Sequence, residues 1–194
     1  MTRETALKLL HDNMQNMNLR RHCYAVEAVM GALYDRLEDG EKKGTEKEKW
    51  KIAGLLHDAD YELTKETART EHTKKVLEWL RKADAETDIY DAIAAHAWGY
   101  VSFAPQPKTK MQWALYTCDE LTGLIVAVAL VKPDKKLASV TVDSVMKKWS
   151  SQSFAAGVNR KQIEECVSRL GIPLQEFVEI ALTALQGIHE ELEL

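Results

Sequence analysis

The chain has 194 residues, of which 45% are hydrophobic and 29% are charged, and its net charge is −4. This composition excludes a disordered chain, and a chain of this length can bury the core of one domain. Its 26 basic residues are outnumbered by 30 acidic ones, so stable nucleic-acid binding is not expected.

Apolar residues recur every three or four positions along most of the chain, which predicts helices. In chain order, the first two helices are expected over about 19–37 and 50–57. The third is expected to begin at a cap, Thr64 or Thr67, and to run through His72 to about Leu80. Four more are expected over about 86–98, 110–131, 140–149 and 161–170. A last helix is expected to have Pro173 in its first turn. The charged segment 39–49 and the proline-containing segment 99–108 are predicted loops.

These elements predict an all-α protein with one domain over residues 1–194. Its core is expected over about 19–131, with the C-terminal helices of 140–194 packed on it. The run 124–131 contains β-branched residues that would also fit a buried strand, but no turn signal precedes it, which favours a helix. The polar segment 134–160 has no clear pattern, and either a cap over a site or a dimer contact would suit it.

The three cysteines, Cys23, Cys118 and Cys166, are widely separated and form no CxxC motif. Reduced, buried thiols are therefore expected rather than a disulfide framework or a zinc ribbon. The N-terminus is polar, unlike a signal peptide, and the most apolar run, 121–131, is shorter than the roughly 20 residues of a membrane span. We therefore expect a cytoplasmic protein without membrane contacts.

Three of the six histidines and two aspartates stand next to apolar helical segments. His22 lies on the stripe of the first long helix, the pair His57-Asp58 follows a buried segment, and His96 follows two alanines. Asp119 directly precedes the most apolar segment of the chain. An ionisable group in such surroundings needs a partner, and a metal ion is one; a hydrogen-bonded core histidine or a helix-terminal carboxylate is the alternative. His72 has polar neighbours, so an exposed histidine is the alternative there.

The order His22, His57-Asp58 and Asp119 resembles the HD superfamily of metal-dependent phosphohydrolases, all-α proteins with the signature H…HD…D. The surrounding residues strengthen the resemblance: Asn18 to His22, Gly54 to Asp58 and Cys118 to Gly123 are similar to segments of bacterial HD proteins, and Phe154 to Val158 is similar to a segment C-terminal to the signature in one bacterial branch. The resemblance implies a single HD domain on a helical bundle.

The resemblance also implies a two-metal centre, because His72 and His96 fall in the two further histidine positions of such proteins. His22, His57, Asp58 and Asp119 would then hold one ion. Asp58, His72 and His96 would hold the second, so that Asp58 bridges both ions and positions the hydroxide. Imidazole and carboxylate ligands suit Mn, Fe, Co, Ni or Zn, and the sequence does not choose among these.

Other polar residues near these positions are candidates for supporting roles. Asp60 and Glu62 would orient ligands or transfer a proton, with an ordinary acidic turn as the alternative. Arg21, Lys65 and Arg69 would contact substrate phosphate, with solvated surface charges as the alternative. The aromatic residues that follow His96 would line a pocket or pack in the core.

The sequence therefore predicts a metal-dependent phosphoric ester hydrolase that acts on a small phosphorylated metabolite or nucleotide. The same order of six ligands also resembles HD-fold di-iron oxygenases, which are the alternative enzyme class. A metal-stabilised binding or regulatory module without turnover is a third interpretation. A small-molecule substrate is the expected partner, and a homodimer is left open.

Overall fold

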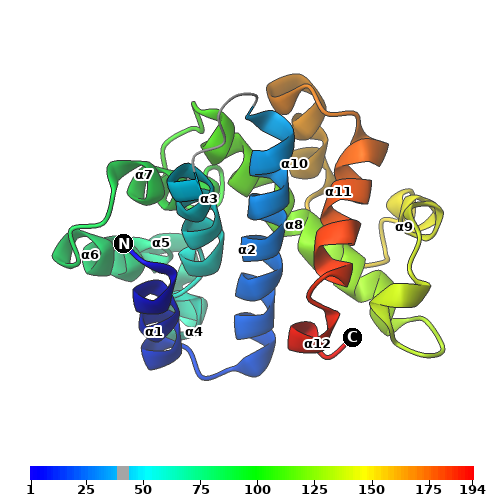
Figure 1. The fold of residues 1–194 in the computed structure, drawn as a ribbon, viewed down its shortest axis with the longest axis horizontal. Coiled ribbons are helices and arrows are strands. Elements are labelled where there is room, and N and C mark those ends of the chain that lie inside the picture. Colours follow the sequence, from blue (N-terminus) through cyan, green and yellow to red (C-terminus); the bar gives the residue numbers. More distant parts are fainter. Residues whose placement is uncertain (39–43) are drawn as a thin grey trace.

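Three helices occupy the centre of the protein: α2 (Met17–Leu37), α3 (Gly44–Leu56) and α8 (Lys110–Leu130). The computed structural model describes residues 1–38 and 44–194. Figure 1 shows α2 and α3 side by side, with α8 running obliquely past α2, and these helices contact one another. Their inward-facing apolar residues form the core to which the other helices contribute.

The remaining α-helices surround this centre: α1 (Arg3–Asn13), α4 (Tyr61–Thr64), α5 (Ala68–Glu71), α6 (Lys74–Lys82), α7 (Thr87–His96), α9 (Val142–Trp149), α10 (Arg160–Glu165), α11 (Leu174–Gln186) and α12 (His189–Leu192). A π-helical turn, Cys166–Leu170, continues α10 and ends at Gly171, which has a left-handed φ of 68°. The described residues contain no β-strand, only one isolated bridge between Trp98 and Val101. The predicted all-α fold is confirmed, and 124–130 is helix rather than strand.

A close approach between α2 and α3 occurs at Gly54. A Cβ atom at this position would lie 2.8 Å from the backbone oxygen of Val26 and 2.9 Å from the backbone nitrogen of Glu27. Only glycine therefore fits without moving one helix away from the other. The contact lies three residues before His57 and one turn after His22, so it holds these two histidines near each other.

The C-terminal helices pack on this core. The helix α11 lies along α2 and also contacts α8, while α10 lies along α8. The helix α8 is long and apolar enough to cross a membrane by length and composition alone, but 67% of its most apolar window is buried inside the protein. This burial is typical of the core helix of a soluble domain.

The structure corrects several predicted element boundaries. The helix α3 begins at Gly44, inside the segment predicted as a loop, and residues 39–43 of that segment lie outside the described residues. Neither Thr64 nor Thr67 caps a long helix, because short turns follow them and α6 begins only after Thr73. His72 therefore precedes α6 and does not lie on it. The short helix α12 was not predicted.

Candidate metal centre

The six residues that the sequence singles out as ligands lie together where α2, α3, α7 and α8 meet. They come from different elements: His22 from α2, His57 and Asp58 from the residues directly after α3, His72 from the turn before α6, His96 from the last position of α7 and Asp119 from α8. His57, His72 and His96 are buried, and the other three are partly exposed. Chain positions nearly 100 residues apart thus form one cluster of imidazoles and carboxylates.

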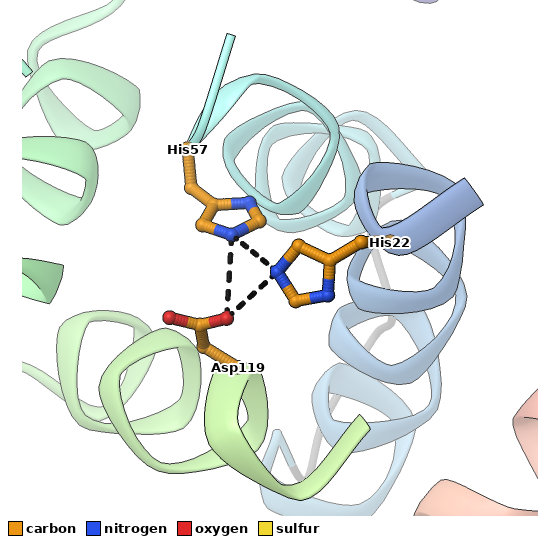
Figure 2. A group of neighbouring side chains, drawn as sticks. All are labelled: His22, His57 and Asp119. Atoms are coloured by element: carbon orange, nitrogen blue, oxygen red, sulfur yellow. Dashed lines mark hydrogen bonds and ion pairs between the residues drawn. The ribbon is translucent and has the colours of Figure 1, made fainter. Parts of the chain in front are cut away.

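Three of these residues, His22, His57 and Asp119, point toward one another from α2, the turn after α3 and α8, as Figure 2 shows. The Oδ1 atom of Asp119 lies 2.9 Å from Nε2 of His22 and 3.4 Å from Nε2 of His57. The two Nε2 atoms are 3.2 Å apart. Three ligand atoms within this distance of one another suit a single metal ion.

A second pair of histidines lies beside the first, with Asp58 between them. The Nε2 atoms of His72 and His96 are 3.1 Å apart, and Oδ1 of Asp58 lies 3.3 Å and 3.5 Å from them. The other oxygen of Asp58, Oδ2, lies 3.7 Å from Nε2 of His22 and 3.6 Å from that of His57. Asp58 therefore presents one oxygen to each histidine pair.

The other ring nitrogen of each histidine is anchored to the protein. Nδ1 of His57 lies 2.8 Å from the carbonyl oxygen of Gly54, and Nδ1 of His96 lies 2.6 Å from that of Ile93. Because a carbonyl only accepts, each of these Nδ1 atoms is the one that carries the hydrogen. The lone pair of Nε2 is then directed at the cluster, which is the arrangement of a metal-binding histidine.

The same pattern holds for the remaining two histidines. Nδ1 of His22 lies 3.3 Å from Oγ1 of Thr122, whose hydroxyl donates to the carbonyl oxygen of Asp119 at 2.7 Å. The hydroxyl is thereby left as an acceptor for His22. Nδ1 of His72 donates to Oδ1 of Asp60 at 3.3 Å. All four Nε2 atoms consequently act as acceptors in the neutral rings.

This hydrogen-bond pattern provides a test of whether a metal fits. Two neutral acceptor nitrogens that face each other at 3.1–3.2 Å have no hydrogen to share, so each pair requires a cation, which is either a proton on one ring or a metal ion. Two nitrogens bound at about 2.0–2.1 Å to one zinc-like ion lie roughly 3 Å apart. The donor set and its spacing therefore fit the binding of a divalent metal within this cluster.

The electrostatics favour ionised carboxylates in the cluster. Burial opposes the ionisation of Asp58, but the neighbouring His57, His96 and His72 outweigh it and hold the pKa of Asp58 well below its usual range. His57 and His22 have the same effect on the pKa of Asp119, again against burial. Burial lowers the pKa of His57, but Asp58 and Asp119 together raise it to about 9. The two carboxylates thus concentrate negative charge where a cation would lie.

Asp60, which the sequence marks as a possible ligand-orienting residue, is fully buried behind His72. Besides the bond from His72, it accepts the backbone N–H groups of Thr73 at 3.2 Å, Lys75 at 3.0 Å and Val76 at 3.3 Å. Its carboxylate thus caps α6, a position that the helix dipole favours for a negative charge. Thr73 turns the chain with a φ of 72°, which is unusual for a β-branched residue. Asp60 therefore fixes both the ring of His72 and the start of α6.

A cavity of about 480 Å³ opens beside the cluster. Its lining includes Asp58, His72, His96 and Asp119, so the proposed ligands form part of its floor. Its other described lining residues are Tyr61, Arg69, Ala97, Trp98, Gly99, Tyr100, Tyr116, Glu120, Gly157, Asn159 and Gln162. Burial and the neighbouring Asp119 raise the pKa of Glu120 to about 7. The cavity has the size of a small-molecule site.

Of the three basic residues predicted to contact phosphate, the structure places one in the cavity wall. The guanidinium of Arg69 lies over the ring of Tyr100, 4.4 Å from its centroid. Arg21 forms an ion pair with Glu193, and Lys65 is exposed; neither lines the cavity. The two predicted phosphate roles of Arg21 and Lys65 have no support in this geometry.

Glu62 also lies away from the cluster. Its Oε2 atom accepts the backbone N–H groups of Gln15 at 2.6 Å and Asn16 at 2.9 Å, so it ties α4 to the turn before α2. Sequence reasoning missed Thr122, Glu120 and the cavity residues of the segment 157–162. Thr122 stands three residues after Asp119, one helical turn away, and this spacing is the signal that would have found it.

Comparison with known proteins agrees with this geometry. The sequence model of the HD domain matches residues 19–128, more than half of the chain, and the chain belongs to the HD domain family. This family is a superfamily of metal-dependent phosphohydrolases whose members bind divalent metals. No curated protein matches the chain. The matched segment contains all six residues of the cluster.

Proposed function

We propose that the protein is a metal-dependent phosphohydrolase that acts on a small phosphorylated metabolite or nucleotide at a dinuclear centre. His22, His57, Asp58 and Asp119 would hold one ion, and Asp58, His72 and His96 the other. The observation that carries the proposal is the orientation of Asp58, whose two oxygens face different histidine pairs. Divalent ions bound there would polarise the phosphoryl oxygens and activate water.

The protein's own residues would bind and orient the substrate. Arg69 is the single Lys or Arg among the described residues that line the cavity. A planar guanidinium binds phosphate oxygens in a bidentate manner, and its contact with Tyr100 restricts its orientation. One fixed cation next to the centre favours a substrate with a single phosphoryl group over a polyphosphate.

The experiment is a measurement of phosphate release from a panel of phosphomonoesters and nucleotides with added manganese. Asp58→Asn is the background control, because it keeps the size of the side chain but removes its charge. We expect release from at least one monoester by the native protein and none by the variant. Elemental analysis of protein purified without added metal belongs to the same experiment.

Two other outcomes would contradict the proposal and identify an alternative. Iron that co-purifies, with O₂ consumed on substrate addition and no phosphate released, would indicate an HD-fold di-iron oxygenase. Specific ligand binding with neither reaction would indicate a metal-stabilised binding module.

A further inference from the structure

One wall of the cavity comes from outside the part of the chain that matches the HD domain. The match ends at residue 128, whereas Gly157, Asn159 and Gln162 line the cavity together with residues of the matched part. Gly157 and Asn159 lie between α9 and α10, and Gln162 lies in α10. We refer to these three residues, together with Glu120 of α8 inside the matched part, as the C-terminal wall. The HD fold alone therefore does not complete this site.

The C-terminal wall is attached to α8 on both sides of Asp119. The backbone N–H of Asn159 donates to Oε2 of Glu120 at 3.0 Å, one residue after Asp119. Nε2 of Gln162 donates to the carbonyl oxygen of Tyr116 at 2.7 Å, three residues before Asp119. These two bonds fix the distance between the wall and the carboxylate that would hold a metal.

Arg160 holds the loop that carries the wall. Its guanidinium donates to the backbone carbonyl oxygens of Trp149 at 2.8 Å, Ser151 at 3.1 Å and Phe154 at 2.7 Å. One side chain thus satisfies several carbonyl groups of an irregular segment. A loop fixed in this way loses little conformational entropy when a ligand binds, which is a property of preorganised binding sites.

The chemistry of the wall differs from that of the phosphate-binding part of the cavity. Arg69 contacts Tyr100, and the centroid of the Tyr100 ring lies 6.1 Å from that of His72. The guanidinium of Arg69 therefore lies near the second histidine pair, His72 and His96. The wall instead offers the carboxylate of Glu120 and the amide oxygen of Gln162, while the side-chain oxygen of Asn159 caps α10 by accepting the backbone N–H of Gln162 at 3.3 Å. The oxygens of Glu120 and Gln162 accept hydrogen bonds from hydroxyls, and a carboxylate disfavours a second anionic group.

We propose that the C-terminal wall determines substrate specificity by selecting a phosphomonoester whose alcohol carries further hydroxyl groups. Arg69 and the metal centre would bind the phosphoryl group, while Glu120 accepts a hydrogen bond from a hydroxyl of the alcohol. An ester of an apolar alcohol of the same size would leave Glu120 without this bond and would bind more weakly. The inference rests on the proposed function, because that function places the phosphoryl group at the metal centre.

The test measures binding rather than turnover. Calorimetry at about pH 8.5, where Glu120 is ionised, uses the full-length, manganese-loaded protein. It gives the Kd of inorganic phosphate and of the phosphonate analogues of glycerol 3-phosphate and propyl phosphate, which stand in for the two esters because their C–P bond is not hydrolysed. We expect the glycerol 3-phosphate analogue to bind about tenfold more tightly than the propyl phosphate analogue, the factor that corresponds to one charge-assisted hydrogen bond. Glu120→Gln should reduce this ratio to about twofold. Glu66→Gln, at an exposed position that does not line the cavity, should leave the ratio as in the native protein.

A second variant tests the shape of the wall. A Cβ atom at Gly157 would have no heavy atom within 4 Å, so a larger side chain can begin there without a clash at Cβ. Gly157→Leu should weaken the binding of both esters severalfold relative to inorganic phosphate, because a larger side chain takes up space beside the alcohol.

Equal binding of the two esters to the native protein would overturn the inference, as would an unchanged ratio in Glu120→Gln or unchanged ester binding in Gly157→Leu. Selective ester binding without any phosphate release would contradict the proposed hydrolysis but support the role of the C-terminal wall in specificity. Phosphate release from both esters with equal KM would support hydrolysis and overturn that role. If neither the esters nor inorganic phosphate bind, both proposals are wrong.

Discussion

The carboxylate of Asp60 accepts a hydrogen bond from Nδ1 of His72 at 3.3 Å and thereby directs Nε2 of that ring toward Asp58. The same carboxylate accepts three backbone N–H groups at the start of α6, so its own position is fixed. A ligand held by a buried carboxylate is both oriented and made more basic. The position of the second histidine pair therefore depends on a residue that would not itself touch a metal.

This relationship predicts that Asp60→Asn weakens one metal site selectively. The affinity for the second metal should fall about 10- to 100-fold, the range measured when partners of metal ligands are changed, while the first site keeps its affinity. Metal titration followed by calorimetry would resolve the two sites. Glu62→Gln is the matched control, because Glu62 lies two residues away and accepts hydrogen bonds from the turn before α2. Equal weakening of both sites would indicate a purely structural effect.

A second prediction concerns the bridging position of Asp58. Asp58→Ala removes an oxygen from each histidine pair, so metal content should fall at both sites when measured by elemental analysis. His96→Ala, which changes only the second pair, should lower the metal content from two ions per chain to one. Two ions per chain retained by Asp58→Ala would refute the bridging assignment.

The candidate ligands could be predicted from the sequence where they stand next to apolar helical segments. His57 and Asp58 stand directly after an apolar helical stretch, and Asp119 stands directly before the most apolar one, so the order of the candidate ligands could be recognised. The placement of His72 on a helix was wrong, because Thr73 adopts a left-handed conformation and the helix begins after it. A regular apolar stripe does not reveal a backbone turn that a distant carboxylate stabilises.

The C-terminal wall could not be predicted for a related reason. The bond between Asn159 and Glu120 joins residues 39 positions apart, and that between Gln162 and Tyr116 joins residues 46 apart. Such contacts depend on how α10 packs on α8, which no local periodicity determines. The assignment of the six residues as metal ligands stays a prediction, although the structure places them together.

The burial of all three cysteines leads to a third prediction. Cys23, Cys118 and Cys166 are fully buried, and burial raises the pKa of the Cys166 thiol to about 12. Because only the thiolate reacts, an aromatic disulfide reagent at about pH 8 should modify none of them in the folded protein. The same reagent should modify all three in denaturant, where thiols have a pKa of about 8.5. Rapid reaction of one thiol in the folded protein would contradict the burial of the three side chains.

The contact of Gly54 with α2 predicts opposite effects for two glycine-to-alanine substitutions. In Gly54→Ala, the new Cβ would lie 2.8–2.9 Å from backbone atoms of Val26 and Glu27, which cannot move without displacing α2. Overpacking of this kind costs about 1–3 kcal/mol of unfolding free energy. Because the strain separates α2 from α3, it should also weaken the metal site that His22 and His57 would form.

The matched control is Gly123→Ala in the interior of α8. Gly123 is exposed, and a Cβ there would have no heavy atom within 4 Å, so no clash arises. Alanine favours an exposed helix interior over glycine by about 0.8–1.0 kcal/mol, which should stabilise the protein by a similar amount. Urea unfolding of the two variants and the native protein measures both effects under the same conditions. A Gly54→Ala variant as stable as the native protein would show that α2 and α3 are not in such close contact at this position.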